Sequence, residues 1–258
     1  MNLKPYFSIA VVCACFSIQI HAQDSYVAQV KKQDSVKHQM NFIKVNLMGL
    51  PIKNFSFQYE RVLSKVISVA VSYRFMPTSK IPFATSIANS ASSNNSQDTK
   101  DAIEKLRMSN FAITPEIRFY LGKGYGKGFY IGLFYRYTSF TVDHFAISYD
   151  DVNDLDMNGK LTTNTGGILF GAQWSLGKHL CLDWQIFGPH YGSGKGILSG
   201  ISSQPLTPTQ QNTLKTNLDD IDIPLTTKTV AVNATGGSLT LSGPWAGMRS
   251  ALCLGFKF

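Results

Sequence analysis

Two residues in the last third of the chain are of the types that nucleophilic catalysis uses. The segment Gly188-Pro-His-Tyr-Gly-Ser193 places His190 three residues before Ser193. A histidine can act as the base that activates a serine hydroxyl. However, a spacing of three puts these side chains on opposite faces of a regular strand. The alternative is a histidine and a tyrosine at an interface, followed by a Gly/Ser loop.

A second group of residues could bind calcium. Asp154, Asp156 and Asn158, followed by Gly159, match the first half of an EF-hand loop, in which alternate oxygens converge on the ion. The twelfth position of such a loop is a bidentate glutamate, but here it is Thr165. The alternative is an acidic loop tip with an Asn-Gly hairpin turn. We therefore predict no bound metal and no other cofactor.

Cys181 and Cys253 are the two cysteines outside the N-terminal segment. Both are expected to point inward from neighbouring antiparallel strands, at similar heights. A cross-strand disulfide would then be geometrically allowed in an oxidising compartment. Two buried free thiols are the alternative.

Charged residues of both signs recur on the polar side of alternating segments. Inside a narrow closed sheet they should pair, because an isolated buried charge is costly. With eight strands, the interior is about wide enough for side chains to fill it. We predict a network that closes the interior, and a gated path for small solutes is the alternative. The residues are Lys44, Glu60, Arg74, Glu116, Arg118, Arg136, Asp183 and Arg249.

Eight segments of alternating apolar and polar residues must position these groups. Such alternation predicts strands with one apolar and one polar face. Pro115 interrupts one of them and predicts a bulge, because proline cannot donate a ladder hydrogen bond. Phe187 is expected on an inward face. The segments are 43–47, 55–60, 67–75, 111–120, 129–137, 168–174, 180–187 and 249–258.

The connections between these segments alternate in length. Those after the second, fourth and sixth are short, whereas those after the third, fifth and seventh are long, at about 76–109, 142–165 and 189–245. Outer-membrane barrels have short periplasmic turns and long outer loops. A soluble β-protein would not require this asymmetry. We predict a short helix at 98–107 and a capped helix start at Thr207-Pro208. We also predict an added hairpin at 227–241.

The N-terminus predicts export. Lys4 is the only charge among residues 1–22, which include an apolar stretch from Phe7 to Cys15 and end in Ile20-His-Ala22. This is typical of a cleaved signal peptide, with a lipoprotein or membrane anchor as the alternative. Residues 23–41 form a polar periplasmic leader, and residues 42–258 the barrel. Beyond residue 23, no stretch approaches the ~20 apolar residues of a transmembrane helix. Strands could then cross a membrane only as a closed sheet.

The chain has 258 residues and a formal net charge of +8. A basic surface could contact lipopolysaccharide phosphates or could simply aid solubility. We expect no nucleic-acid partner, because the chain is predicted to be exported and has no recognisable binding motif.

The last strand ends in Phe256-Lys-Phe258. This terminal aromatic resembles the C-terminal strand of bacterial outer-membrane barrels. The resemblance implies that Phe256 and Phe258 form a signal for the barrel-assembly machinery. Small barrels that deacylate lipid A use a serine and a histidine near the outer leaflet, so a lipid A-modifying enzyme centred on His190 is an alternative function.

In topology, the chain resembles small eight-stranded Gram-negative outer-membrane barrels of the OmpA/OmpX type. It is more closely similar to an uncharacterised Bacteroidetes-type barrel family. The similarity lies in Asn54-Phe-Ser-Phe-Gln-Tyr-Glu-Arg61, Thr114-Pro-Glu-Ile-Arg-Phe-Tyr-Leu-Gly122, Gly171-Ala-Gln-Trp-Ser-Leu-Gly-Lys178 and Gly188-Pro-His-Tyr-Gly192. The resemblance implies a fold and a location in the outer membrane, but no catalytic residue. We expect a monomeric barrel with a closed interior, whose outer loops bind a surface ligand or lipopolysaccharide. A narrow channel is a further alternative.

Overall fold

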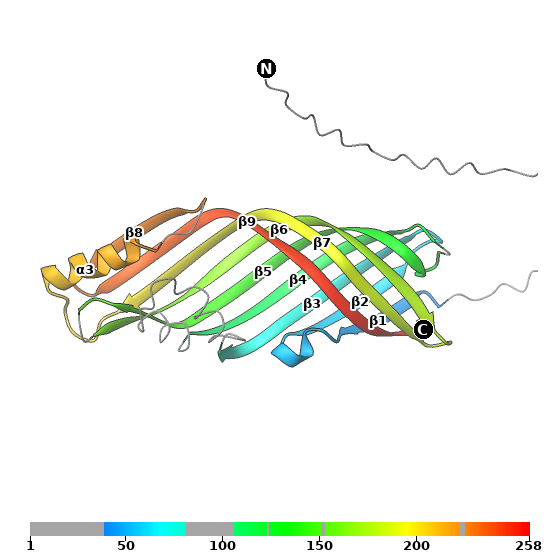
Figure 1. Cartoon of the computed structure of the whole chain (residues 1–258), viewed down its shortest axis with the longest axis horizontal. Helices are drawn as coiled ribbons and strands as arrows, with labels where there is room; N and C mark the ends of the chain where they lie inside the picture. The colour runs from blue at the N-terminus through cyan, green and yellow to red at the C-terminus, as the bar shows by residue number, and fades with distance from the viewer. Residues whose placement is uncertain (1–38, 81–105, 123, 151–152, 222–224) are drawn as a thin grey trace, which may run out of the picture. The chain divides into compact units, whose positions relative to one another are not determined.

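The computed structural model describes residues 39–80, 106–122, 124–150, 153–221 and 225–258 (Figure 1). These residues belong to one compact unit, His38–Phe258. The expected signal peptide and nearly all of the leader lie outside the described residues. So does most of the helix expected at 98–107, whose last residue instead begins a strand.

Eight antiparallel strands form a closed ring. They are β1 (Asn41–Asn46), β2 (Phe55–Val62), β3 (Ile67–Lys80), β4 (Arg107–Tyr120), β5 (Gly128–Ser148), β6 (Asp154–Leu176), β7 (Leu180–Ile201) and β9 (Gly236–Lys257). Neighbours in this order pair with each other, and the ring closes because β1 also pairs with β9. A further strand, β8 (Thr227–Asn233), pairs with the first residues of β9, from Gly236 to Ser242. The prediction of an all-β sheet with eight strands in a ring is confirmed.

Three short connections lie at one end of the ring, which we call the turn end. They join β2 to β3, β4 to β5 and β6 to β7, at residues 63–66, 121–127 and 177–179. At the opposite end, which we call the helix end, lies α3 (Pro208–Asp219) (Figure 1). The β1–β2 connection, with the 3-10 helix η1 (Leu50–Ile52), points toward this end but is short. Of the three connections predicted to be long, those after β3 (81–106) and β7 (202–235) are long, whereas the connection after β5 has only residues 149–153, so the predicted alternation of connection lengths is confirmed only in part.

Four strands are much longer than their apolar patterns predicted. β5, β6, β7 and β9 have 21, 23, 22 and 22 residues. The segments expected to be loops at 142–165 and 189–245 therefore consist largely of paired strand. The prediction failed because the extensions contain many Thr, Ser and Gly residues, which keep the backbone ladder without an apolar face.

The helix end is held together by its own apolar cluster. Helix α3 begins at the predicted place: Thr207 caps it in a capping box with Gln210, and Pro208 follows at the first turn. The predicted hairpin is β8 with the start of β9. The buried members of the cluster come from β6, α3, β9 and the segment before α3, and are Leu155, Met157, Leu206, Leu214, Leu218 and Leu239.

Two expectations about strand regularity were wrong. Pro115 makes no bulge: β4 and β5 keep one register on either side of it, with Ile113 opposite Tyr137 and Glu116 opposite Phe134. Phe187 does not point inward, because a bulge between Gln185 and Gly188 reverses the faces of β7 beyond it. Phe187 is therefore exposed.

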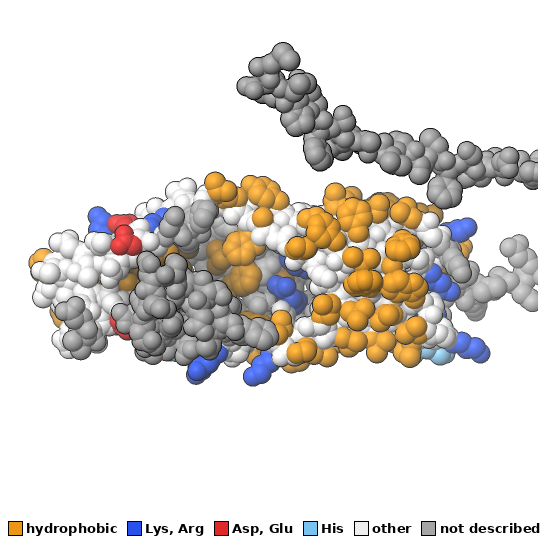
Figure 2. Space-filling model, in the orientation of Figure 1, with side chains coloured by type: hydrophobic (Ala, Val, Ile, Leu, Met, Phe, Trp, Pro, Cys, Tyr) orange, Lys and Arg blue, Asp and Glu red, His pale blue; other side chains and the backbone are white. Residues whose placement is uncertain are grey.

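The ring is apolar outside and polar inside. Each of its strands carries exposed or half-exposed apolar side chains on the outer face, among them Ile43, Phe57, Val71, Ile113, Leu133, Phe170, Trp184 and Leu254. Figure 2 shows this surface spread over the ring, whereas the helix end is mostly polar. Among the described residues, no helix has the length and apolar character needed to cross a membrane.

Candidate functional site

The predicted inward charges lie inside the ring. Strand alternation puts them there, because residues two apart share a face. Six of the eight form ion pairs: Lys44, Glu60, Glu116, Arg118, Asp183 and Arg249. Arg74 and Arg136 line the same interior without a carboxylate partner among the described residues.

Lys44 is the centre of the pairing nearest the turn end. Its ammonium Nζ donates to Glu60 Oε2 at 2.5 Å, to Asp183 Oδ2 at 2.6 Å and to Gln173 Oε1 at 2.5 Å. An ammonium has three protons, so these three acceptors satisfy it completely. This saturation is what allows a lysine to be 1% exposed.

Arg118 bridges the same acids from the opposite wall. Its Nη1 donates to Asp183 at 2.7 Å and to Glu60 at 3.1 Å, and its Nε donates to Glu116 at 2.5 Å. Its guanidinium carbon also lies 4.4 Å from the centre of the Tyr130 ring. Because a planar guanidinium has donors in several directions, one side chain can hold three carboxylates together.

Neutral side chains complete the network. The Tyr120 hydroxyl donates to Glu60 at 2.7 Å, and the Tyr130 hydroxyl to Asp183 at 2.8 Å. Ser68 donates to Glu60 at 2.5 Å. Alternation along β4 and β5 puts both tyrosines on the inward face. Their position on the same face as the charges was the available signal.

Apolar residues are buried together inside the ring toward the turn end. Phe42 and Val62 pack beside Cys181, and Tyr125 of the β4–β5 turn packs against them. The Tyr125 N–H donates to the Lys65 carbonyl at 2.8 Å, which holds the turn over this end. Together with the ion pairs, these buried side chains occupy the interior toward the turn end.

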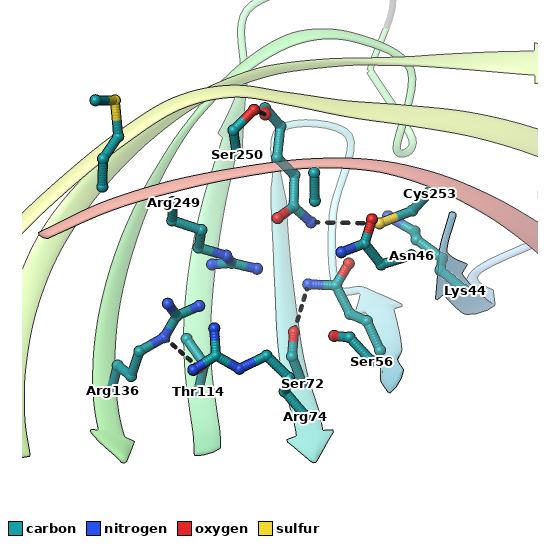
Figure 3. A pocket seen from close by; sticks show the side chains of 14 residues that line it. Lys44, Asn46, Ser56, Ser72, Arg74, Thr114, Arg136, Arg249, Ser250 and Cys253 are labelled. Carbon is teal, nitrogen blue, oxygen red and sulfur yellow. Dashed lines mark hydrogen bonds between the residues drawn. The ribbon is translucent and has the colours of Figure 1, made fainter. Parts of the chain in front are cut away.

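Beyond the network lies a chamber of about 90 Å³ (Figure 3). The guanidinium groups of Arg74, Arg136 and Arg249 approach one another there from β3, β5 and β9. Arg249 pairs with Glu116 at 2.6 Å. Arg136 donates through Nε to the Thr114 hydroxyl at 3.1 Å. The buried Nε of Arg74 has no hydrogen-bond partner in the part of the chain that the structure describes.

The structure does not bring His190 and Ser193 together. His190 lies on the inward side of β7, where its ring contacts that of Phe134 edge-on with centroids 6.0 Å apart. Ser193 is exposed on the other face. A second histidine, His144, contacts Asp156 at 2.8 Å on the surface. Ser193 therefore does not face His190.

Asp154, Asp156 and Asn158 lie in β6 rather than in a loop. Asp154 accepts from Ser148, and Asn158 accepts from the His144 backbone. A strand rises about 3.3 Å per residue, so Asp154 and Asn158 are about 13 Å apart along it. Three oxygens spread over that distance cannot all bind one calcium ion. Residues 149–153 connect β5 to β6, so the expected Asn158-Gly159 turn lies instead within β6.

Cys181 and Cys253 are both buried free thiols. The two strands are neighbours, as predicted, but Cys181 lies opposite Gly255 and Cys253 opposite Asp183. The cysteines are thus offset by two residues. Diagonal neighbours of this kind have Cα atoms about 7–8 Å apart, which exceeds the ~4.4–6.8 Å of a disulfide.

The terminal aromatics lie on the outer face where the ring closes. Phe256 stacks on His179 with centroids 5.6 Å apart and on Phe258 at 6.3 Å. The backbone of Phe258 exchanges two hydrogen bonds of 3.0 Å with Asn41. The end of the chain therefore fastens β9 to β1.

Comparison with known proteins gives one match. Nothing among curated proteins or among solved structures matches the chain. One family model matches residues 24–192, which is more than half of the chain, and is described as a protein of unknown function. The matched span includes every member of the network and chamber named above except Arg249. The chain therefore belongs to this family of unknown function, DUF3575.

Proposed function

We propose that this protein is an integral outer-membrane β-barrel with a closed interior, whose outer segments bind a surface ligand or lipopolysaccharide. The observation that carries the proposal is the reversed polarity of the ring. Charged residues are buried inside, and large apolar side chains are exposed on every strand outside. A soluble protein rarely exposes so much continuous apolar surface. In a bilayer the same surface contacts lipid.

Closure of the ring supports the same conclusion. In lipid, every backbone donor and acceptor needs a partner within the protein, so a sheet can cross only when it has no open edge. The β1–β9 pairing removes that edge over the part of the ring nearest the turn end. This is also the part that carries the apolar surface.

Aromatic residues mark two levels on the outer face. Toward the helix end, Phe75 lies opposite both Phe55 and Phe111 on neighbouring strands. Toward the turn end lie Phe129, Trp174 and Phe256, all exposed. Along β5, Phe129 and Tyr137 are eight residues apart, about 26 Å at the usual strand rise. With a tilt of about 40°, this is about 20 Å of membrane thickness, near the ~25 Å of an outer-membrane apolar band.

The helix end supports a binding role for the outer segments. Helix α3 contacts β5, β8 and β9 around a buried leucine cluster. A segment with its own core presents a fixed surface, which loses less conformational entropy on binding than a flexible loop. In this proposal the helix end faces outward, and the turn end and N-terminus face the periplasm. The barrel is a monomer, inserted by the assembly machinery.

The test of membrane insertion expresses the full chain, with its proposed signal peptide, in a Gram-negative host and follows the mature protein, residues 23–258. We expect the protein in the outer-membrane fraction, resistant to carbonate extraction. We also expect faster gel migration for the unheated than for the boiled sample, as for a folded barrel. A protein released by carbonate as a soluble periplasmic species would contradict the proposal.

A lipid A-modifying enzyme centred on His190 is the alternative function, and mass spectrometry of lipid A separates the two. We expect identical lipid A profiles from cells that express the wild type, His190→Ala or no protein. A wild-type modification that disappears in His190→Ala would favour the enzyme.

A further inference from the structure

The interior charges do not balance. Among the eight charged residues of the network and the chamber, five are basic (Lys44, Arg74, Arg118, Arg136, Arg249) and three are acidic (Glu60, Glu116, Asp183). Near the turn end, Lys44 and Arg118 are matched by Glu60 and Asp183. The excess therefore lies at the chamber, because the one carboxylate left to balance its three arginines is Glu116, which pairs with Arg249 and is shared with Arg118.

We propose that this chamber, lined by Arg74, Arg136 and Arg249, binds a phosphate group. Guanidinium donors match the oxygens of phosphate in geometry and charge. Among the described residues, Arg74 has an Nε with no hydrogen-bond partner, and the Arg136 guanidinium contacts the neutral Thr114 hydroxyl and the Phe134 ring rather than a carboxylate. Three partly buried cations around a cavity repel one another, and a bound dianion converts that repulsion into attraction. Ser56, Ser72 and Thr114 add hydroxyl groups to the lining.

The chamber has an opening through the side of the ring. Between Pro244 and Ala251, β9 pairs with β7 but with no described strand on its other side. β3 likewise continues beyond its last partner in β2, from Met76 to Lys80. Figure 2 shows basic side chains in a recess on this face, between apolar patches.

The rim of this opening is apolar. Met48 and Leu50 of the β1–β2 connection and Met248 of β9 are 56%, 40% and 67% exposed. A phosphate carried on a lipid could thus place its chain against the rim while its headgroup reaches the arginines. A free phosphate ion could reach the same donors. The site itself depends only on the chamber, whereas the lipid source rests on the proposed function.

The first test measures thermal unfolding of the mature chain folded in detergent. Inorganic phosphate is compared with chloride at equal ionic strength. We expect phosphate to raise the wild-type midpoint until the site saturates, since a ligand that binds only the folded state stabilises it. The double variant Arg74→Gln/Arg136→Gln should lose this shift. Arg107→Gln, which removes an exposed charge from β4, should keep it.

Removing two unpaired charges should not prevent folding, so the double variant should unfold in chloride at or above the wild-type midpoint. If it fails to fold, arginine labelling of the wild type with phenylglyoxal decides. Inorganic phosphate should then protect Arg74 and Arg136 but not Arg107. An absence of both the phosphate shift and this protection, or an equal shift in the folded double variant, would overturn the proposal.

A second arm identifies the source of the phosphate. Micelles are doped with monophosphorylated lipid A or with the same lipid after dephosphorylation. A larger shift with the phosphorylated lipid than with inorganic phosphate supports a lipid headgroup. A shift with inorganic phosphate and none with the lipid supports a soluble oxyanion. Membrane fractionation is independent of both results, so the two proposals can fail separately.

Discussion

Asp183 illustrates what permits charges inside this ring. It has no exposed surface, yet it accepts from Lys44, Arg118 and Tyr130. A buried carboxylate is tolerated when its lone pairs are filled and opposite charges surround it. The network therefore depends on completeness rather than on any one pair, and each member is costly to remove.

We predict that Asp183→Asn strongly destabilises the protein. The substitution keeps the side-chain shape but leaves Lys44 and Arg118 short of a negative charge. Removing one partner of a buried ion pair costs about 3–5 kcal/mol. Urea unfolding in lipid vesicles, followed by tryptophan fluorescence, measures this loss. Asp156→Asn, which affects the exposed pair with His144, is the control and should cost less than about 1 kcal/mol.

Similar losses in the two variants would show that burial of Asp183 adds nothing. A gain in stability for Asp183→Asn would mean that burying the Asp183 carboxylate costs more free energy than its attraction to Lys44 and Arg118 returns.

The cysteines give a second prediction at this scale. We expect two reactive thiols in the mature chain after denaturation without a reductant, and almost none before, because both side chains are buried. Thiol titration with and without denaturant measures this. A mass two hydrogens below that of the reduced chain would instead reveal a disulfide.

At the residue scale, the sequence predicts faces better than partners. Alternation correctly placed Lys44 and Asp183 inside, but they are 139 residues apart, and only the register of the closed ring brings them together. For the same reason, alternation placed both cysteines inside without revealing their offset. Arg74 and Arg136 were expected to pair like the rest. That neither has a carboxylate partner among the described residues depends on distances that alternation does not encode.

At the scale of elements, the strand segments near the helix end differ from those near the turn end. Apolar alternation identified all eight ring strands but not their extensions. The capped start of α3 was found because Thr207, Pro208 and Gln210 form a local signal. The bulge at Gln185 to Gly188 has no comparable signal, and so Phe187 was assigned to the wrong face.

Two adjacent glycines in β6 make opposite predictions about packing. A Cβ added at Gly167 would lie 2.4 Å from the Pro189 carbonyl oxygen and 2.7 Å from both His190 Cβ and Phe134 Cζ. A Cβ added at Gly166 would meet nothing closer than 3.9 Å. A side chain at position 167 would point into a packed interior, and one at position 166 would point outward.

We therefore predict that Gly167→Ala destabilises the protein by about 1–3 kcal/mol, the usual cost of overpacking. Gly166→Ala should be neutral or should stabilise by about 0.4–1 kcal/mol, because alanine restricts the unfolded chain. Urea unfolding of both variants is the measurement. Equal effects of the two substitutions would contradict the assignment of faces around this position.

At the scale of the whole molecule, the interior has two parts with different properties. Near the turn end, ion pairs and the Phe42 layer fill it. Beyond them, the chamber is hollow and opens through the wall. A ring of this kind should bind solutes from one side without passing them through. The closed part also explains how eight strands can enclose so many charges, since the narrow interior forces them into contact.

The last prediction concerns conduction. We expect no stable current steps from the wild type in a planar bilayer, because Lys44, Glu60 and Asp183 are buried and hydrogen-bonded inside the ring, with Phe42 and Val62 also buried toward the turn end. The double variant Lys44→Ala/Asp183→Ala removes one charge of each sign and leaves Arg118 with Glu60 and Glu116. It should conduct small currents. The exposed pair of substitutions Asp156→Ala/Lys160→Ala is the control and should remain silent. A conducting wild type would refute closure of the interior. A silent Lys44→Ala/Asp183→Ala variant that still folds would assign the seal to Phe42, Val62 and Tyr125 instead of to the ion pairs.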